Sequence, residues 1–170
     1  MGRVESGGRT LRGRTTPFES DVVTKARNFM KRGAAANVWL FRRTGGRLGS
    51  RWRVGRKFIR GVPVCLLTTT GRRSGLPRVA PLLYLRDGSD VVVVASQGGM
   101  PRHPDWYHNL VAEPRVHVEL PGREFDGAAR IADPTEAARL WPLLDDLYPS
   151  FAIYRARAGR EIPIVVITPS

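Results

Sequence analysis

The chain has 170 residues, 42% of them hydrophobic, and its 28 Lys and Arg against 15 Asp and Glu give a net charge of +13. This length predicts one domain that can bury a core, and no apolar run reaches the roughly 18 residues that would span a bilayer. A single cysteine excludes a disulfide framework, and the N-terminus shows no secretory signal, so we expect a cytoplasmic protein.

The excess positive charge lies in the first third of the chain. Residues 1–60 carry 16 Lys and Arg against 3 Asp and Glu, whereas residues 61–170 carry 12 of each. Residues 1–18 are rich in Gly, Arg and Thr, which predicts a disordered basic arm ahead of a single domain over 19–170. A basic segment on a neutral body favours an anionic partner: nucleic acid, an anionic membrane surface or a polyanionic ligand.

An amphipathic helix is predicted over 20–43, because apolar residues recur there at three- and four-residue steps. Its basic residues lie mostly off the apolar stripe. Such a helix either packs on its own domain or lies on a membrane, and residues 20–60 would then make peripheral contact with anionic lipid at the inner face of the cell membrane. Residues 44–61, punctuated by glycine, predict a loop or a second short helix.

The rest of the chain predicts a mainly β domain with helices, of the α+β class. Asp87-Gly88 and Pro121-Gly122 are hairpin signals, and Pro149 starts a turn. Short strands at regular spacing with helices between them favour a small barrel over a doubly wound sheet. Strands are expected at 62–69, 78–86, 90–96, 114–120, 123–132 and 162–167, and helices at 104–112 and 134–147.

A glycine-bounded basic turn is the most informative motif. The apolar run at 64–67 continues through three threonines into Gly71-Arg72-Arg73-Ser74-Gly75, with Arg78 three residues further on. A second turn, Ser96-Gln97-Gly98-Gly99, follows the third predicted strand. Glycines let backbone N–H groups crowd an anion, and arginine binds phosphate bidentately. Since neither a Walker loop nor a nucleophile elbow is present, these turns predict a site for a phosphorylated ligand at the end of a sheet.

The chain offers few reactive groups of its own. His103, His108 and His117 lack the spacing of metal ligands, and no catalytic triad is suggested, which points to a borrowed cofactor. Cys65 lies in an apolar run and is expected to be a core thiol. The aromatic residues Tyr148, Phe151 and Tyr154 follow a helix at three-residue spacing, and they form either core packing or the wall of a pocket for a flat ligand.

These separated blocks resemble one family. LLTTTGRRSGLPRVAPLLYL, VVASQGG, the P-x-W-Y-x-N-L run at 104–110, and WPLLDDLYPSF-x-x-Y ending in IPIVVITP are similar to the deazaflavin-dependent nitroreductase family. That family is a branch of the flavin/deazaflavin oxidoreductases with a split β-barrel, FMN-binding-protein-like fold. The resemblance spans about residues 35–168 and implies the same fold here.

The resemblance also implies a cofactor, coenzyme F(420), an 8-hydroxy-5-deazaflavin with a phospholactyl oligoglutamate tail. By this likeness the basic turn holds the phosphate and tail, the second turn passes under the ring, two aromatic residues lie at the cofactor edge, and three face the substrate. The implied cofactor-binding residues are Arg72, Arg73, Ser74, Gly75, Arg78, Pro81, Val94, Ala95, Ser96, Gln97, Gly98, Gly99, Trp106 and Tyr107, and the substrate-binding residues are Tyr148, Phe151 and Tyr154.

The expected reaction is hydride transfer from the reduced deazaflavin to a flat electrophile, either a quinone or a nitroaromatic compound. Ser96 and Tyr148 are the expected hydrogen-bond donors to developing negative charge, and Tyr148, Tyr154 or water would supply the proton. Two positions depart from the family pattern: Gln97 stands where lysine is frequent, and Phe151 stands where the nitro-activating member has a tyrosine.

Two other interpretations remain open. One is a split barrel that binds FMN or haem, since the ring pockets are similar. The other is a non-enzymatic basic module that binds a membrane or RNA through residues 1–45. No recognised nucleic-acid motif is present, so no nucleic-acid partner is expected.

Overall fold

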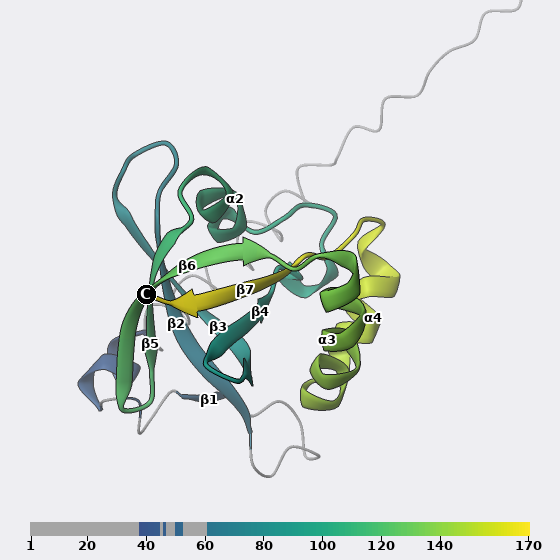
Figure 1. The fold of residues 1–170 in the computed structure, drawn as a ribbon, viewed down its shortest axis with the longest axis horizontal. Coiled ribbons are helices and arrows are strands. Elements are labelled where there is room, and N and C mark those ends of the chain that lie inside the picture. The colour runs from purple at the N-terminus through teal and green to yellow at the C-terminus, as the bar shows by residue number, and fades with distance from the viewer. Residues whose placement is uncertain (1–37, 45, 47–49, 53–60) are drawn as a thin grey trace, which may run out of the picture. The chain divides into compact units, whose positions relative to one another are not determined.

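The computed structural model describes residues 38–44, 46, 50–52 and 61–170 (Figure 1), all within a unit that spans Ala34–Ser170. The predicted disordered arm over 1–18 lies outside these residues, as do most of the predicted helix over 20–43 and most of 44–61. Residues 38–43, where that helix was expected to end, are helical. No helix in the described ranges has the length and hydropathy to cross a membrane.

The strands form a closed antiparallel barrel. Within the described residues the order β2-β3-β4-β7-β6-β5 returns from β5 to β2, so that Leu67 of β2 pairs with Ala80 on one side and Val118 on the other. The two-residue β1 adds to the start of β2. This confirms the predicted split-barrel class. The bounds are β1 Arg51–Trp52, β2 Val62–Thr70, β3 Pro77–Asp87, β4 Asp90–Val94, β5 Arg115–Leu120, β6 Arg123–Ile131 and β7 Ile164–Pro169.

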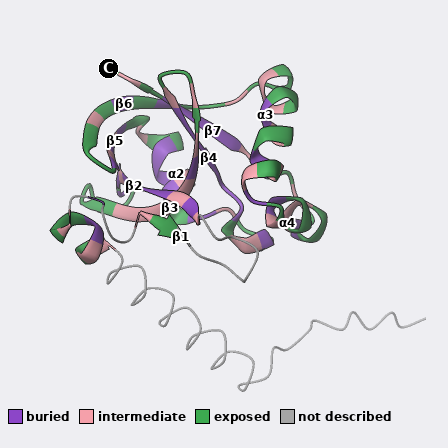
Figure 2. Ribbon diagram, turned by 90° about the horizontal axis from the view of Figure 1, so that it is seen from below, coloured by how far each residue is buried: buried purple, intermediate pink, exposed green. Residues whose placement is uncertain are grey.

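The core has two parts because β4 and β7 are buried on both faces. Val91 and Val93 point into the barrel, whereas Val92 and Val94 point outward, as the alternation of strand side chains requires. The outward residues are covered by α3 (Pro134–Leu147) and α4 (Ser150–Ala158). Figure 2 shows the buried faces of these helices turned toward the strands and their exposed faces turned away.

Helix α2 (Asp105–Ala112) packs onto the interior of the barrel. Its Trp106 and Leu110 belong to the same buried cluster as Leu67 and Val118. Cys65 is fully buried in this cluster, and burial raises the pKa of its thiol to about 12. A thiol that stays protonated and has no access to solvent is a core side chain, which agrees with the expectation from sequence.

Several bounds differ from the sequence predictions. The last strand, expected at 162–167, is β7 at Ile164–Pro169, and β1 at Arg51–Trp52 is a strand within 44–61, where a loop or a short helix was expected. The third strand was expected to run to residue 96, but β4 ends at Val94, since Ser96 has helical dihedrals and Gln97 a positive φ of 46°. Pro149 lies in a turn, as expected, and this turn leads directly into α4, a helix that the sequence did not predict. Proline suits the first turn of a helix, where the missing N–H costs nothing, and the three-residue aromatic spacing is helical.

Candidate functional site

The basic turn between β2 and β3 is held by hydrogen bonds of its own backbone. The N–H groups of Ser74 and Gly75 donate to the Gly71 carbonyl (3.1 and 2.7 Å), and Gly71 N–H donates to the Leu76 carbonyl at 2.9 Å. A Cβ on Gly71 would lie 2.9 Å from Ser74 Oγ, and Gly75 has a φ of 67°, so both positions favour glycine. The turn thereby presents three exposed arginines: Arg72, Arg73 and Arg78.

A buried asparagine anchors this turn to α2. Asn109, 5% exposed, accepts a hydrogen bond from Arg72 N–H through Oδ1 (3.2 Å) and donates through Nδ2 to Thr69 Oγ1 at 3.1 Å. Thr69 Oγ1 in turn donates to the Arg78 carbonyl at 3.4 Å. The network fixes the backbone of the turn while it leaves the guanidinium groups accessible.

Replacing Asn109 by alanine is expected to lower the free energy of unfolding by about 1–3 kcal/mol, because Arg72 N–H and Thr69 Oγ1 lose a buried partner. Urea denaturation measures this difference. Val111→Ala, at an exposed position of the same helix, is the control and should change the value by less than about 0.5 kcal/mol. An equal effect of the two variants would contradict the anchoring role of Asn109.

The segment after β4 forms a second cluster of donors. Gln97–Gly99 is one turn of 3-10 helix, closed by hydrogen bonds from Gly99 N–H to the Ser96 carbonyl (2.9 Å) and from Met100 N–H to the Gln97 carbonyl (3.3 Å). Within the described part of the chain, the N–H groups of Ser96, Gln97 and Gly98 have no acceptor. Consecutive unpaired N–H groups suit a ligand that carries carbonyl or ring-nitrogen acceptors.

Two arginines from α4 and the residues after it contact this segment. Arg157 donates to the Gly98 carbonyl at 2.6 Å, and Arg160 donates to the carbonyls of Ala95 and Ser96 at 3.2 and 3.3 Å. Gly99 packs so tightly on α4 that a Cβ there would lie 3.0 Å from Tyr154 Cα. The second turn and the aromatic helix are therefore one packed unit.

The predicted aromatic set lies on both sides of the start of α4. The hydroxyls of Tyr148 and Tyr154 are 3.2 Å apart. Tyr148 and Phe151 are 6% and 4% exposed and belong to the cluster between α3, α4 and the barrel, whereas Tyr154 is half-buried at its edge. Burial, together with the Tyr148 hydroxyl, raises the pKa of Tyr154 to about 12. Tyr154 is therefore a phenol that keeps its proton at neutral pH.

The other residues of the implied cofactor site have mixed surroundings. Trp106 is buried in the barrel interior, and Tyr107 packs partly exposed beside it, with its ring centroid 4.7 Å from that of His103. Val94 and Ala95 are buried, and Pro81 is partly buried in β3. Gln97 is exposed and its amide lies close to the carbonyls of Arg102 and His103.

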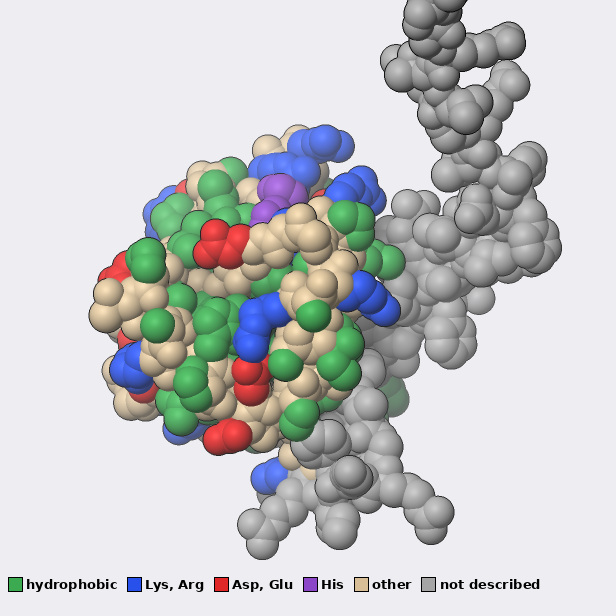
Figure 3. Space-filling view, turned by 90° about the vertical axis from the view of Figure 1, so that its right-hand side faces the viewer, with side chains coloured by type: hydrophobic (Ala, Val, Ile, Leu, Met, Phe, Trp, Pro, Cys, Tyr) green, Lys and Arg blue, Asp and Glu red, His purple; other side chains and the backbone are tan. Residues whose placement is uncertain are grey.

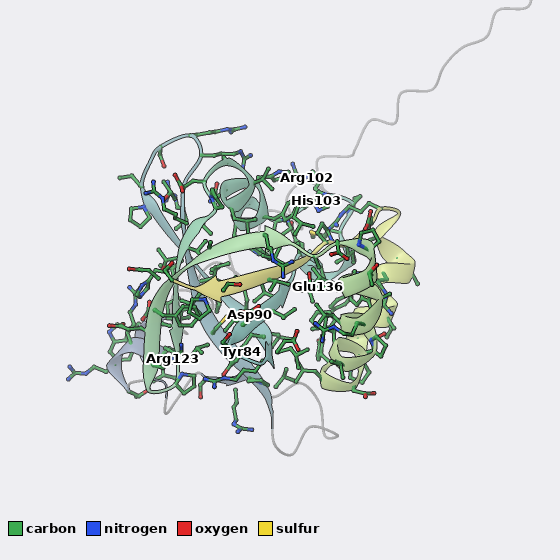
Figure 4. All side chains as sticks on the ribbon, in the orientation of Figure 1. Tyr84, Asp90, Arg102, His103, Arg123 and Glu136 are labelled. Atoms are coloured by element: carbon green, nitrogen blue, oxygen red, sulfur yellow. The ribbon has the colours of Figure 1, made fainter. Side chains whose placement is uncertain are left out.

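Helix α2 links the two turns. Its Asn109 holds the basic turn, and the segment that leads into it carries Arg102 and His103, which lie side by side where α2 begins (Figure 4). In Figure 3, basic side chains lie beside histidine at the upper edge of the face shown, whereas basic and acidic side chains alternate over the rest of it. The basic turn contacts α2 at Asp105 and Asn109, and the predicted ring-binding segment leads into the same helix, so α2 connects the two.

Three residues of this region were missed by the sequence analysis: Asn109, Arg157 and Arg160. Asn109 stood in a motif without an assigned role, and the two arginines lie in a stretch with no periodic pattern. For Arg157 and Arg160, the available signal was Gly159, which adopts a left-handed φ of 62° and ends α4 between them.

Comparisons with known proteins agree with this geometry. Residues 34–169 match the model of the family described as F(420)H(2)-dependent quinone reductase. A protein of Mycobacterium tuberculosis named an F(420)H(2)-dependent quinone reductase is 37% identical over 142 residues, which cover 76% of this chain and 95% of that protein.

Solved structures give the same result. An F(420)H(2)-dependent reductase has a TM-score of 0.58 at 37% identity and covers 62% of this chain and 93% of its own. A structure described as a domain-swapped dimer has a TM-score of 0.60 at 30% identity and covers 85% of this chain and 98% of its own. With the match over residues 34–169, these likenesses show that the chain belongs to the F(420)H(2)-dependent quinone reductase family.

Proposed function

We propose that this protein is an oxidoreductase that uses reduced coenzyme F(420) to reduce a quinone. Membership of the family supports the cofactor, the reaction class and a small quinone as substrate. The cofactor, when bound, supplies a hydride from C5 of its deazaflavin ring. What remains for the protein is to bind the anionic tail, orient the ring, and donate hydrogen bonds where negative charge develops.

The residues present fit such a cofactor. The N–H groups of Ser96, Gln97 and Gly98, which have no acceptor among the residues that the structure describes, offer donors to the edge of a flat ring, and this observation carries the proposal. Arg72, Arg73 and Arg78 are exposed on a turn whose backbone is held by backbone hydrogen bonds and by Asn109. Because a phosphate and a poly-carboxylate tail need several cations, we assign the tail to this turn.

The substrate would lie over the ring, beside α4. Tyr154 keeps its proton and is partly accessible, so we assign it as the hydroxyl that donates to the substrate, with Tyr148 as its buried partner. Ser96 is the second donor that we assign to the same region. Phe151 is almost fully buried, so we expect it to shape the wall of the pocket from behind rather than to donate to the substrate.

Titration of the protein with coenzyme F(420), with FMN in parallel, tests the proposal. We expect saturable micromolar or tighter binding of the deazaflavin, followed by cofactor fluorescence, and at least about tenfold weaker binding of FMN, which has no oligoglutamate tail. Reduction of a naphthoquinone by the reduced deazaflavin should then be measurable by absorbance. Preference for FMN would instead favour the flavin-binding alternative.

A quinone dissolved in a membrane would be met at the lipid surface, and we propose that the basic residues 20–60 make peripheral contact there. Their excess charge supports this, since each Lys or Arg near an anionic bilayer contributes about 1 kcal/mol. Flotation with anionic vesicles should carry the protein along, whereas zwitterionic vesicles or about 0.5 M salt should not. Equal recovery with both vesicle types would contradict contact through charge.

A further inference from the structure

Arg160 occupies a fixed place between α4 and β7. Gly159 before it ends α4 with left-handed dihedrals, and Pro163 after it accepts a hydrogen bond from Ala95 N–H at 3.0 Å. The backbone on both sides is therefore tied to the barrel. From there the side chain extends under the segment that joins β4 to α2.

The guanidinium of Arg160 is surrounded by carbonyl oxygens. Its three nitrogens donate to five of them, four of which belong to residues 95–102, and one nitrogen lies 3.0 Å from His103 Nδ1. The acceptors are the carbonyls of Ala95 (3.2 Å), Ser96 (3.3 Å), Met100 (3.1 Å), Arg102 (3.1 Å) and Glu161 (2.9 Å).

This arrangement orients the peptide groups of the segment. In a trans peptide the carbonyl of one residue and the N–H of the next point in opposite directions. Because the carbonyls of Ala95 and Ser96 face Arg160, the N–H groups of Ser96 and Gln97 face away from it. These are two of the three N–H groups that have no acceptor in the described residues.

In the part of the chain that the structure describes, the charge of Arg160 has no acidic partner. No ion pair among the described residues includes it. Its titratable neighbours are Tyr107 and His103, and His103 accepts a hydrogen bond from it and is therefore neutral. Burial lowers the pKa of His103, and the charge of Arg160 lowers it further. A full positive charge thus lies directly behind two peptide groups and polarises their N–H bonds, as chains of hydrogen bonds do at low dielectric.

We infer that Arg160 is a positioning residue for the deazaflavin: it holds residues 95–103 so that the N–H groups of Ser96 and Gln97 face the ring, and its uncompensated charge favours the reduced ring. Hydride addition puts one negative charge on the ring, and the ring keeps that charge only until a proton follows. A cation behind the ring-facing N–H groups favours the reduced ring that has not taken up this proton. The inference rests on the proposed function, since the ligand is the same cofactor, but the orientation of the segment can be measured without any ligand.

The test compares Arg160→Met and Arg160→Lys with Arg139→Met, which removes an arginine of α3 that pairs with Asp87. Amide hydrogen exchange without ligand should quicken at least tenfold over residues 95–103 in Arg160→Met, and less in Arg160→Lys. The dissociation constant for oxidised coenzyme F(420) should rise at least tenfold in Arg160→Met. In the same variant, the dissociation constant for the reduced cofactor should rise by a factor at least three times larger than the factor for the oxidised cofactor. Arg139→Met should match the wild type within twofold.

If Arg160→Met merely disordered residues 95–103, it would weaken the binding of the oxidised and the reduced cofactor equally. An unchanged ratio of the two dissociation constants would therefore overturn the electrostatic part of the inference. Exchange over 95–103 at the wild-type rate would overturn the positioning part. If wild-type protein does not bind the cofactor, the proposed function fails, and the exchange experiment alone decides whether Arg160 orients the segment. If Arg160→Met does not fold, Arg160→Lys decides with the same readouts.

Discussion

A variant with both Arg72→Ala and Arg73→Ala is expected to bind coenzyme F(420) about 100-fold more weakly than the wild type and to fold normally. Hydrogen bonds between charged groups contribute about 1.5–3 kcal/mol each, and 1.4 kcal/mol is a tenfold change in affinity. Loss of two such contacts therefore predicts a factor of at least about 100. The phosphate and the carboxylates of the tail would lose both guanidinium groups at once.

The fold should tolerate this change because neither side chain supports the turn. Both are exposed, and the ion pair that Arg72 makes within the described residues joins it to a nearly fully exposed Asp105 over 3.8 Å, a geometry that contributes little. The contact that matters to the turn is made by Arg72 N–H with Asn109 Oδ1, and alanine keeps that N–H. Equal melting temperatures of variant and wild type would verify this.

Fluorescence titration at two salt concentrations measures the effect. The wild-type affinity should fall steeply with salt, because charged groups of the tail are screened, and the affinity of the double variant should fall less. Arg123→Ala with Arg139→Ala removes the same charge from β6 and α3 and is the control, expected within about threefold of the wild type. A dissociation constant of the Arg72/Arg73 variant equal to that of this control would refute the assignment of the tail to the turn.

Local patterns allowed most of the fold to be predicted from sequence. The helix expected over 134–147 has those bounds, because Asp133 caps it by accepting from Glu136 N–H at 2.9 Å and Pro134 suits its first turn. The hairpin at Gly88 follows from a glycine that adopts a φ of 63°. Strand spacing favoured a small barrel, and the family resemblance implied a split barrel. Barrel closure, by contrast, depends on the pairing of β2 with β5, which no local pattern specifies.

The contacts that build the site are distant in sequence, and this is why they were missed. Asn109 contacts Arg72 across 37 positions, and Arg160 contacts Ala95 across 65. Periodicity predicts which face of an element is buried, but it does not identify the carbonyl that a particular arginine will reach. Two features of such sequences indicate long-range contacts. One is a buried asparagine on an amphipathic helix, and the other is an arginine between a helix-ending glycine and a buried strand.

These distant contacts connect the two halves of the candidate site. The basic turn is bonded to α2 through Asn109, the segment leading into α2 is bonded to Arg160, and the turn of Gly98 and Gly99 is packed on α4 beside Tyr154. A disturbance of α2 should therefore affect both the tail-binding arginines and the ring-binding N–H groups. The site consists of short loops, but each loop is fixed to a buried element.

Tyr154→Phe is expected to lower turnover with a naphthoquinone about 100-fold, the lower end of the usual contribution of a positioned proton donor, while cofactor affinity stays within about threefold. Tyr148→Phe should lower turnover less, about tenfold, because its hydroxyl is buried and acts through Tyr154 at 3.2 Å. Stopped-flow oxidation of the reduced, bound deazaflavin measures both rates. Tyr84→Phe, which removes a hydroxyl from the barrel interior, is the control and should behave as the wild type.

The dependence of turnover on pH separates a proton donor from a packing residue. Tyr154 has a raised pKa of about 12, caused by burial and by Tyr148, so its donating form is present at all lower pH values. Wild-type turnover should therefore be flat from pH 7 to about 10 with respect to this group, and decline only as the pH rises toward 12. Tyr148→Phe removes one cause of the shift, so the decline should begin at lower pH. A Tyr154→Phe variant with the rate and the pH profile of Tyr84→Phe would exclude Tyr154 as the donor and leave Tyr148 or water to supply the proton.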